Sequence, residues 1–364
     1  MADITRTIGD QEPPYRVLAM DGGGIFGVFT AIMLRKLCDA VPDFLREDRI
    51  TLFAGTSAGA INALLLAKQD DPREAIERRT LEKFYKDERL YTNRLNPVTG
   101  MLSLIGLASW AGEADFYALL DEHFGDMKMK DLKHRVLITA FDLWGTRDAP
   151  SSTAQSWKPK VFYNFPDTEH DRDRYVKDVA YGAASPPTGR RVIDGITDGG
   201  FCADDPSVNA IAKIMSQMRE SNPISAAEES LRDISVLSLG VGAATPHYFL
   251  RSFDFGILPF NLLPTHFGHG FLESPVTTFV LNPDKQATMY IARQLVGEDD
   301  YFRLDPPAIK FPVPSVATTS TLARFSPFRE FYLAQICQGA ESPGVGAYIN
   351  QAEKWLRNHP HGWA

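Results

Sequence analysis

The chain has few cysteines, no excess of basic charge and no long apolar run, and each shortage excludes a class of protein. Its 364 residues include three cysteines, Cys38, Cys202 and Cys337, an odd number set far apart, which indicates reduced thiols and a cytoplasmic location. Lys and Arg total 38 against 46 Asp and Glu, which argues against a surface for a nucleic-acid polymer. No apolar run reaches the roughly 18 residues of a membrane span, and the acidic start does not resemble a signal peptide.

The sequence is rich in apolar residues, and these form predicted strands that alternate with predicted helices. Hydrophobic residues make up 44%, enough for a large core. Apolar strands are predicted over 15–20 and 50–55, and each is followed by a glycine turn and a buried helix, over 27–34 and 58–68. Two strand–loop–helix units in succession predict an α/β fold with a largely parallel sheet. Further elements are predicted at 73–87 (helix), 135–142, 160–165 and 233–242 (strands), and 282–297 (helix).

The first glycine turn, in "AMDGGGIFGVFT" from Ala19, allows two interpretations. Gly22, Gly24 and Gly27 fit the G-x-G-x-x-G spacing of dinucleotide-binding loops. That class of fold also needs an acidic residue at the end of the second strand to hold the ribose. Ser57 stands there instead, so the loop is better interpreted as a set of backbone N–H donors for an oxyanion.

The second glycine turn, "GTSAG" from Gly55 to Gly59, has the G-x-S-x-G pattern of a nucleophile elbow between a strand and a helix. Such a turn exposes the serine side chain at the helix N-terminus, where free N–H groups favour developing negative charge. Ser57 is therefore the predicted nucleophile, and Gly55 and Gly59 let the strand and helix pass closely.

A serine nucleophile needs a base, and the sequence offers histidines and aspartates. No recognisable catalytic loop precedes the late histidines, which are His266, His269, His359 and His361. The pair in "HFGH", His266 and His269, is weak evidence for a metal site because no acidic residue or cysteine is adjacent to it. "DGITDGG" supplies Asp194-Gly195 and Asp198-Gly199-Gly200. An Asp-Gly pair most often forms a turn, but an aspartate beside a serine in a dry cleft can take the hydroxyl proton.

The three motifs together, "DGGGIFG", "GTSAG" and "DGG", resemble patatin-like phospholipases in their order and arrangement. "YGAASPPTGR" from Tyr181, "LSLGVG" from Leu237 and "DDYFRLDP" from Asp299 are similar to later segments of that family. The resemblance covers about residues 15–310. It implies a patatin-like three-layer α/β fold, with a largely parallel central sheet flanked by helices. We predict a flexible lead-in over 1–14, the hydrolase domain over 15–310, and a C-terminal segment, 311–364, packed on the same domain.

The resemblance also implies a chemistry. It predicts a lipid acyl hydrolase of the phospholipase A type that needs no metal or other cofactor, with a Ser–Asp dyad in place of a histidine triad. The implied site residues are Ser57 and Asp198 as the dyad, Gly22, Gly23 and Gly24 as the oxyanion loop, Gly55 and Gly59 in the elbow, and Gly199 and Gly200 after the acid. Asp198 is preferred to Asp194 because it begins the full D-G-G.

One position departs from the family pattern, because Phe26 stands where members usually carry Arg or Lys. A basic side chain there can brace the glycine loop, which phenylalanine cannot. Either another group braces the loop, or an activator must order it; alternatively, Phe26 packs against the acyl chain. Some bacterial members are switched on by a cyclic oligonucleotide in antiviral defence, which makes such a nucleotide a candidate activator.

The expected partners are membrane phospholipid as substrate, a second copy of the chain as a candidate oligomer partner, and no nucleic-acid polymer. The enzyme would be cytoplasmic and would meet the inner face of the membrane transiently. Two apolar segments, 101–110 and 253–264, are candidate contacts with lipid or buried segments. Alternative functions are a small-ester esterase or thioesterase with the same dyad, and a catalytically inactive lipid- or nucleotide-sensing module.

Overall fold

The computed structural model describes residues 14–92, 112–145, 157–166, 169–186, 190–221, 230–242, 283–307 and 326–364. Several predicted features lie outside these residues: the lead-in except for its last residue, Pro14, both candidate lipid-contact segments, His266 and His269.

The described strands form one sheet in the order β4-β3-β2-β1-β6-β7, and β5 pairs with β3 off this path. Their bounds are β1 Tyr15–Met20, β2 Leu52–Thr56, β3 Val136–Asp142, β4 Lys158–Tyr163, β5 Ile196–Asp198, β6 Ile234–Leu239 and β7 Tyr301–Leu304. The pairs β1–β2, β2–β3, β1–β6 and β6–β7 are parallel, whereas β4 and β5 run antiparallel to β3. The predicted α/β fold with a largely parallel sheet is confirmed.

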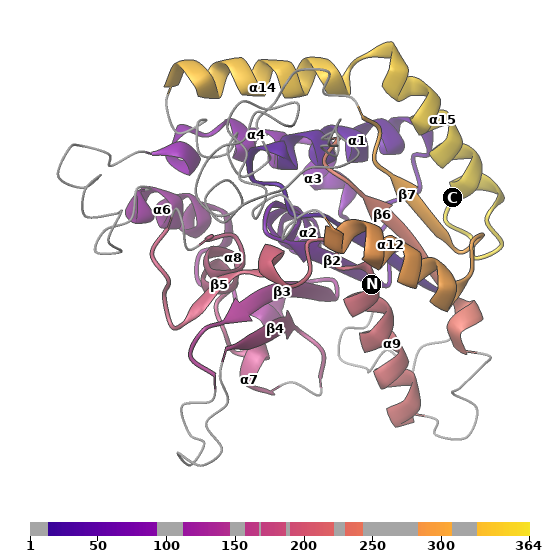
Figure 1. Cartoon of the computed structure of the whole chain (residues 1–364), viewed down its shortest axis with the longest axis horizontal. Coiled ribbons are helices and arrows are strands. Elements are labelled where there is room, and N and C mark those ends of the chain that lie inside the picture. Colours follow the sequence, from indigo (N-terminus) through magenta and orange to yellow (C-terminus); the bar gives the residue numbers. More distant parts are fainter. Residues whose placement is uncertain are drawn as a thin grey trace, which may run out of the picture.

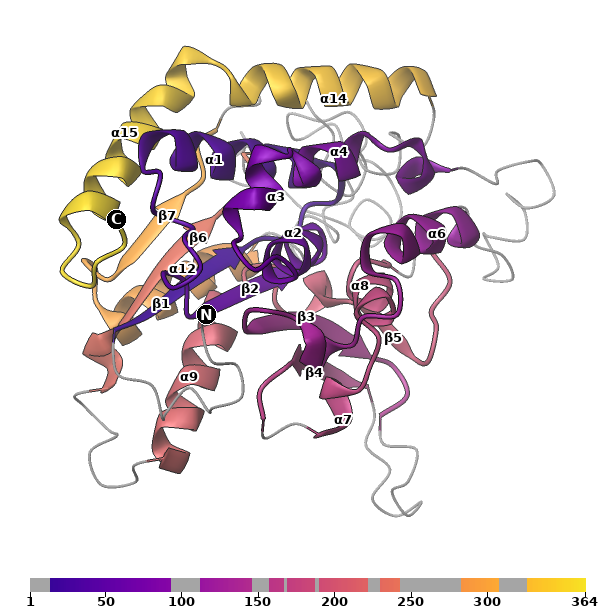
Figure 2. The same cartoon turned by 180° about the vertical axis from the view of Figure 1, so that it is seen from behind.

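Helices cover both faces of this sheet (Figures 1 and 2). The described α-helices are α1 Gly27–Ala40, α2 Ala58–Ala67, α3 Arg73–Glu77, α4 Thr80–Lys86, α6 Glu113–Phe124, α7 Glu169–Arg172, α8 Val176–Ala183, α9 Ser207–Ser221, α12 Pro283–Val296, α14 Ser326–Ala340 and α15 Pro343–Asn358. Short 3-10 turns include η2 Gly24–Phe26 and η6 Gly199–Phe201. Helices α14 and α15 pack against α1, so the end of the chain covers its beginning.

Two hydrophobic clusters fill the space between the sheet and the helices. Adjacent strand residues point to opposite faces, so Leu18 and Phe53 join the cluster with α1 and α2, whereas Val17 and Leu52 join the cluster with α9 and α12. Because both faces are covered, β1 and β2 are apolar almost throughout, as buried parallel strands are. Because β1, β2, β6 and β7 run parallel to one another, their carboxyl ends lie together at one edge of the sheet.

Candidate active site

Ser57 occupies a strained turn between β2 and α2. Its backbone has φ 50° and ψ −114°, a conformation that non-glycine residues rarely adopt. A Cβ on Gly59 would overlap the carbonyl oxygen of Met20, and one on Gly55 would overlap the carbonyl oxygen of Gly59. Only glycine therefore fits at both positions, and the turn has the close strand–helix packing that a nucleophile elbow requires.

Asp198 is the last residue of β5, and it lies beside Ser57. The pairing of Asp198 with Ala140 holds it against β3, the neighbour of β2. The Ser57 Oγ donates a hydrogen bond of 2.6 Å to Asp198 Oδ2, and the Gly200 N–H donates one of 2.8 Å to Oδ1. The side chains come from positions 141 residues apart in the chain. The structure thus brings the two predicted dyad residues into direct contact.

The same geometry separates the two candidate aspartates. Asp194 lies in an exposed turn with φ 51°, whereas Asp198 is only 6% exposed. Burial raises the pKa of Asp198 to about 6, although the hydrogen bonds from Ser57 and Gly200 and the charge of Arg190 oppose that shift. At neutral pH the carboxylate is therefore mostly ionised, yet far more basic than an ordinary aspartate, which suits a general base.

The glycine loop lies directly against Ser57. A Cβ on Gly22 would lie 3.4 Å from the Ser57 Cβ. The Gly22 N–H, however, already donates to the main-chain oxygen of Asp204 at 3.0 Å. Of the three predicted oxyanion donors, the N–H groups of Gly23 and Gly24 therefore remain as candidates. The backbone of Gly24 has φ 54°, a left-handed conformation that glycine adopts more readily than other residues.

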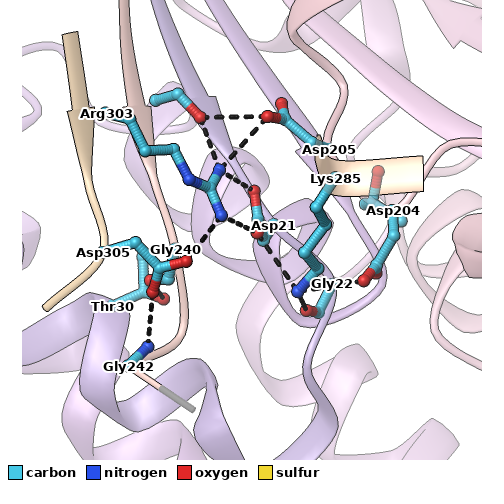
Figure 3. A network of polar contacts seen from close by, with 12 residues as sticks. Asp21, Gly22, Thr30, Asp204, Asp205, Gly240, Gly242, Lys285, Arg303 and Asp305 are labelled. Carbon is cyan, nitrogen blue, oxygen red and sulfur yellow. Dashed lines mark hydrogen bonds and ion pairs between the residues drawn. The ribbon is translucent and has the colours of Figure 1, made fainter. Parts of the chain in front are cut away.

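Phe26 does not extend into the site, because it is fully buried in the cluster that contains α1 and α2. Charged side chains from other elements surround the loop instead (Figure 3). Arg303 on β7 donates to both carboxylate oxygens of Asp21, at 2.8 and 2.6 Å, and Lys285 on α12 lies 3.2 Å from Asp21 Oδ2. Sequence reasoning missed this network, because nothing local to these residues signals that they meet.

A second cluster of polar side chains lies at the C-terminal end of α15. Among the described residues, Asp300, His359 and His361 have ligand atoms within 4.8 Å of one another and could hold a metal ion. The His361 N–H donates to His359 Nδ1 at 3.1 Å, which places the ring proton of neutral His359 on Nε2, the nitrogen 3.2 Å from Asp300. A metal ligand needs that nitrogen free of a proton. Within the part of the chain that the structure describes, His359 Nε2 and His361 Nδ1 are nevertheless buried without a hydrogen-bond partner, and burial and the charge of His361 lower the pKa of His359 to about 4.

The fold and the elbow define an α/β protein with a hydrolase-like site, and comparison with known proteins gives the family. The family model for patatin-like phospholipase matches residues 18–211, more than half of the chain, and includes all three motifs. The protein belongs to the patatin-like phospholipase family, a family of hydrolases.

Bacterial relatives match over most of their length. The chain is 26% identical to CotR of Bacillus subtilis, whose name describes a candidate sporulation hydrolase, over 87% of this chain and 97% of CotR. It is also 26% identical to protein teg of Priestia megaterium, covering 80% and 87%. A cGAMP-activated phospholipase of Pseudomonas aeruginosa is 26% identical, with 81% of this chain and 79% of that protein covered.

Among the described helices of the present chain, none is long and apolar enough to cross a membrane.

Proposed function

We propose that the protein is a serine–aspartate acyl hydrolase that cleaves fatty acyl esters of membrane phospholipids. Membership of the patatin-like phospholipase family supports the substrate class. The observation that supports the chemistry most directly is the 2.6 Å hydrogen bond from the Ser57 hydroxyl to the buried Asp198 carboxylate. This contact supports the proposal because a serine nucleophile must lose its hydroxyl proton to a neighbouring base.

In the proposed reaction, the Ser57 Oγ attacks the ester carbonyl carbon while its proton passes to Asp198 Oδ2. The N–H groups of Gly23 and Gly24 donate hydrogen bonds to the oxyanion of the tetrahedral intermediate. As the intermediate collapses, the C–O bond to the lysophospholipid breaks, and the leaving oxygen takes the proton from Asp198. Water then attacks the acyl-enzyme carbonyl carbon and gives a proton to Asp198. When the C–O bond to Ser57 Oγ breaks, Asp198 returns this proton to Oγ, and the fatty acid leaves. No metal or cofactor is required for these steps.

We further propose that a cyclic oligonucleotide switches the enzyme on, in antiviral defence at the cytoplasmic face of the membrane. The support is the similarity to the cGAMP-activated phospholipase, which spans 81% of this chain. A nucleotide that binds the folded protein raises its thermal midpoint by mass action. No shift across a panel of cyclic di- and trinucleotides would remove the activator from the proposal and leave the hydrolase.

The test of the hydrolase is fatty-acid release from phospholipid vesicles, with and without a mixture of cyclic oligonucleotides. Ser57→Ala and Asp198→Asn should each abolish release. Asp194→Asn is the matched control, because it changes the neighbouring Asp-Gly pair without touching Ser57, and it should release fatty acid like the natural protein. Release that survives Ser57→Ala would refute the dyad. Hydrolysis of short-chain esters or thioesters alone would favour the small-ester alternative.

A further inference from the structure

Lys285 reaches the glycine loop from a distant part of the chain. The ammonium lies 3.0 Å from Asp204 Oδ2 and 3.2 Å from Asp21 Oδ2, and it donates to the Gly22 carbonyl oxygen at 3.5 Å. Lys285 stands 263 residues after Gly22 in sequence, and its side chain is only 14% exposed. Figure 3 shows the ammonium between Asp21, Gly22 and Asp204.

These contacts close a ring around Gly22. The Gly22 N–H donates to the main-chain oxygen of Asp204, the Asp204 carboxylate pairs with Lys285, and Lys285 returns to the Gly22 carbonyl. Both main-chain polar groups of Gly22 are therefore held. Because Gly23 follows Gly22 directly, the ring also fixes the direction in which the next peptide leaves β1.

Arg303 holds the other side of Asp21 and does not replace Lys285. Its guanidinium contacts Asp21, Asp205 and Asp305, with N–O distances of 2.6 to 3.1 Å. Without Lys285, the Asp204 carboxyl, whose side chain is 13% exposed, would lose this ion pair. Burial, with the nearby charge of Asp21, already raises the pKa of Asp204 to about 7 against the opposing effect of Lys285.

We propose that Lys285 is a positioning residue that holds the Asp21–Gly22 segment so that the N–H groups of Gly23 and Gly24 can receive the oxyanion. From α12, Lys285 thus supplies the bracing that Phe26, which is buried in the core, does not. The inference rests on the proposed function for its catalytic consequence, whereas the bracing of the loop is a property of the folded protein alone.

The test compares Lys285→Met with Lys177→Met. Lys177 is a matched control: its side chain is 12% exposed and it pairs with two carboxylates, Asp121 at 2.7 Å and Asp126 at 3.1 Å, away from the network. On a soluble p-nitrophenyl ester, Lys285→Met should lose about tenfold or more in kcat with little change in KM, since one oxyanion donor is typically worth about 10²–10³. Affinity for a trifluoromethyl ketone, whose adduct carries an oxyanion, should fall in parallel, and Lys285→Arg should restore part of both.

Hydrogen exchange gives a readout that does not need turnover. Amides of the peptide spanning residues 17–29 should exchange faster in Lys285→Met than in the natural protein, and Lys177→Met should leave them unchanged. Unchanged exchange, or a kcat and ketone affinity equal to those of the Lys177→Met control, would overturn the inference. If Lys285→Met does not fold, Lys285→Gln carries the same comparisons. Failure of the proposed function is distinct, because it appears as ester hydrolysis that does not depend on Ser57, whatever the exchange result.

Discussion

Asp198→Asn should remove the activity and at the same time stabilise the protein at alkaline pH. Burial raises the pKa of this carboxyl from 3.8 to about 6, a difference of about 2 units, which corresponds to about 3 kcal/mol. The folded state thus binds the proton more tightly than the unfolded state. The stability associated with that proton is present below about pH 4 and is lost as the pH rises through about 6. Asparagine carries no charge, so it does not suffer this loss.

The assay is urea denaturation of both proteins across the pH range. The free energy of unfolding of Asp198→Asn should exceed that of the natural protein by up to about 3 kcal/mol at pH 8, and the difference should shrink toward zero near pH 4. Titrating groups that Asp198 does not influence affect both proteins alike. Asp204 is an exception, because the Asp198 charge contributes to its raised pKa, so the difference reports Asp198 together with its effect on Asp204. Asp194→Asn, in the exposed turn, should stay within about 0.5 kcal/mol of the natural protein throughout.

The same carboxyl should set the pH dependence of catalysis. With a pKa of about 6, about one tenth of the molecules hold the ionised base at pH 5 and about nine tenths at pH 7. The rate of ester hydrolysis should therefore rise about tenfold between these values, and Asp198→Asn should lower kcat by about 10²–10⁴-fold. A variant less stable than the natural protein at pH 8, a stability difference independent of pH, or a flat pH–rate profile would refute the reasoning.

Three further predictions concern the scaffold and the chemistry. Gly59→Ala should destabilise the protein by about 1–3 kcal/mol or more in urea, because its Cβ would overlap the Met20 carbonyl; unchanged stability would contradict the close packing. Trp363→Ala should cost about 3–5 kcal/mol, since this side chain is fully buried and donates to the Ser235 hydroxyl at 2.9 Å; a loss within 1 kcal/mol would show that the C-terminal segment contributes little. Treatment with EDTA should leave fatty-acid release unchanged, because the proposed mechanism uses Asp198 and no metal ion as the base; a loss that one divalent cation restores would require a different mechanism.

Local patterns in the sequence predicted the elbow and the parallel units, and longer-range features escaped them. The turn at Ser57 was predictable because strand, glycines and helix are contiguous. The helix predicted over 73–87 is instead two helices, α3 and α4, because Arg79 adopts φ 52°, and no glycine or proline marks that break. Helix α9 was missed although apolar residues recur at helical spacing within it, and that signal could have revealed it.

The charged network shows why the rest of the site could not be predicted. Lys285 and Arg303 lie in segments whose charges fit a solvated helix face and a strand edge, and sequence offers no sign that both reach Asp21. The Arg303 contacts exist because β1, β6 and β7 are parallel neighbours, so residues near their carboxyl ends meet at one edge of the sheet. Lys285 reaches the same place from the first turn of α12. Which residues meet at that edge depends on the order of the strands in the sheet, whereas a sequence motif depends only on residues adjacent in the chain.

Two features of the site are unfavourable in themselves and persist only because the surrounding fold stabilises them. The Ser57 backbone is held in a rare conformation, and Asp198 is kept out of water at a pKa well above that of a free carboxyl. Neither would persist in a mobile loop, because the backbone would relax and water would enter. Both are instead attached to buried strands with apolar clusters on each face, and the adjoining glycine loop is tied by Lys285 and Arg303 to elements from the other end of the chain. The burial that raises the pKa of Asp198 also keeps it aligned with Ser57, and for this reason Asp198→Asn should gain stability as it loses the proposed activity.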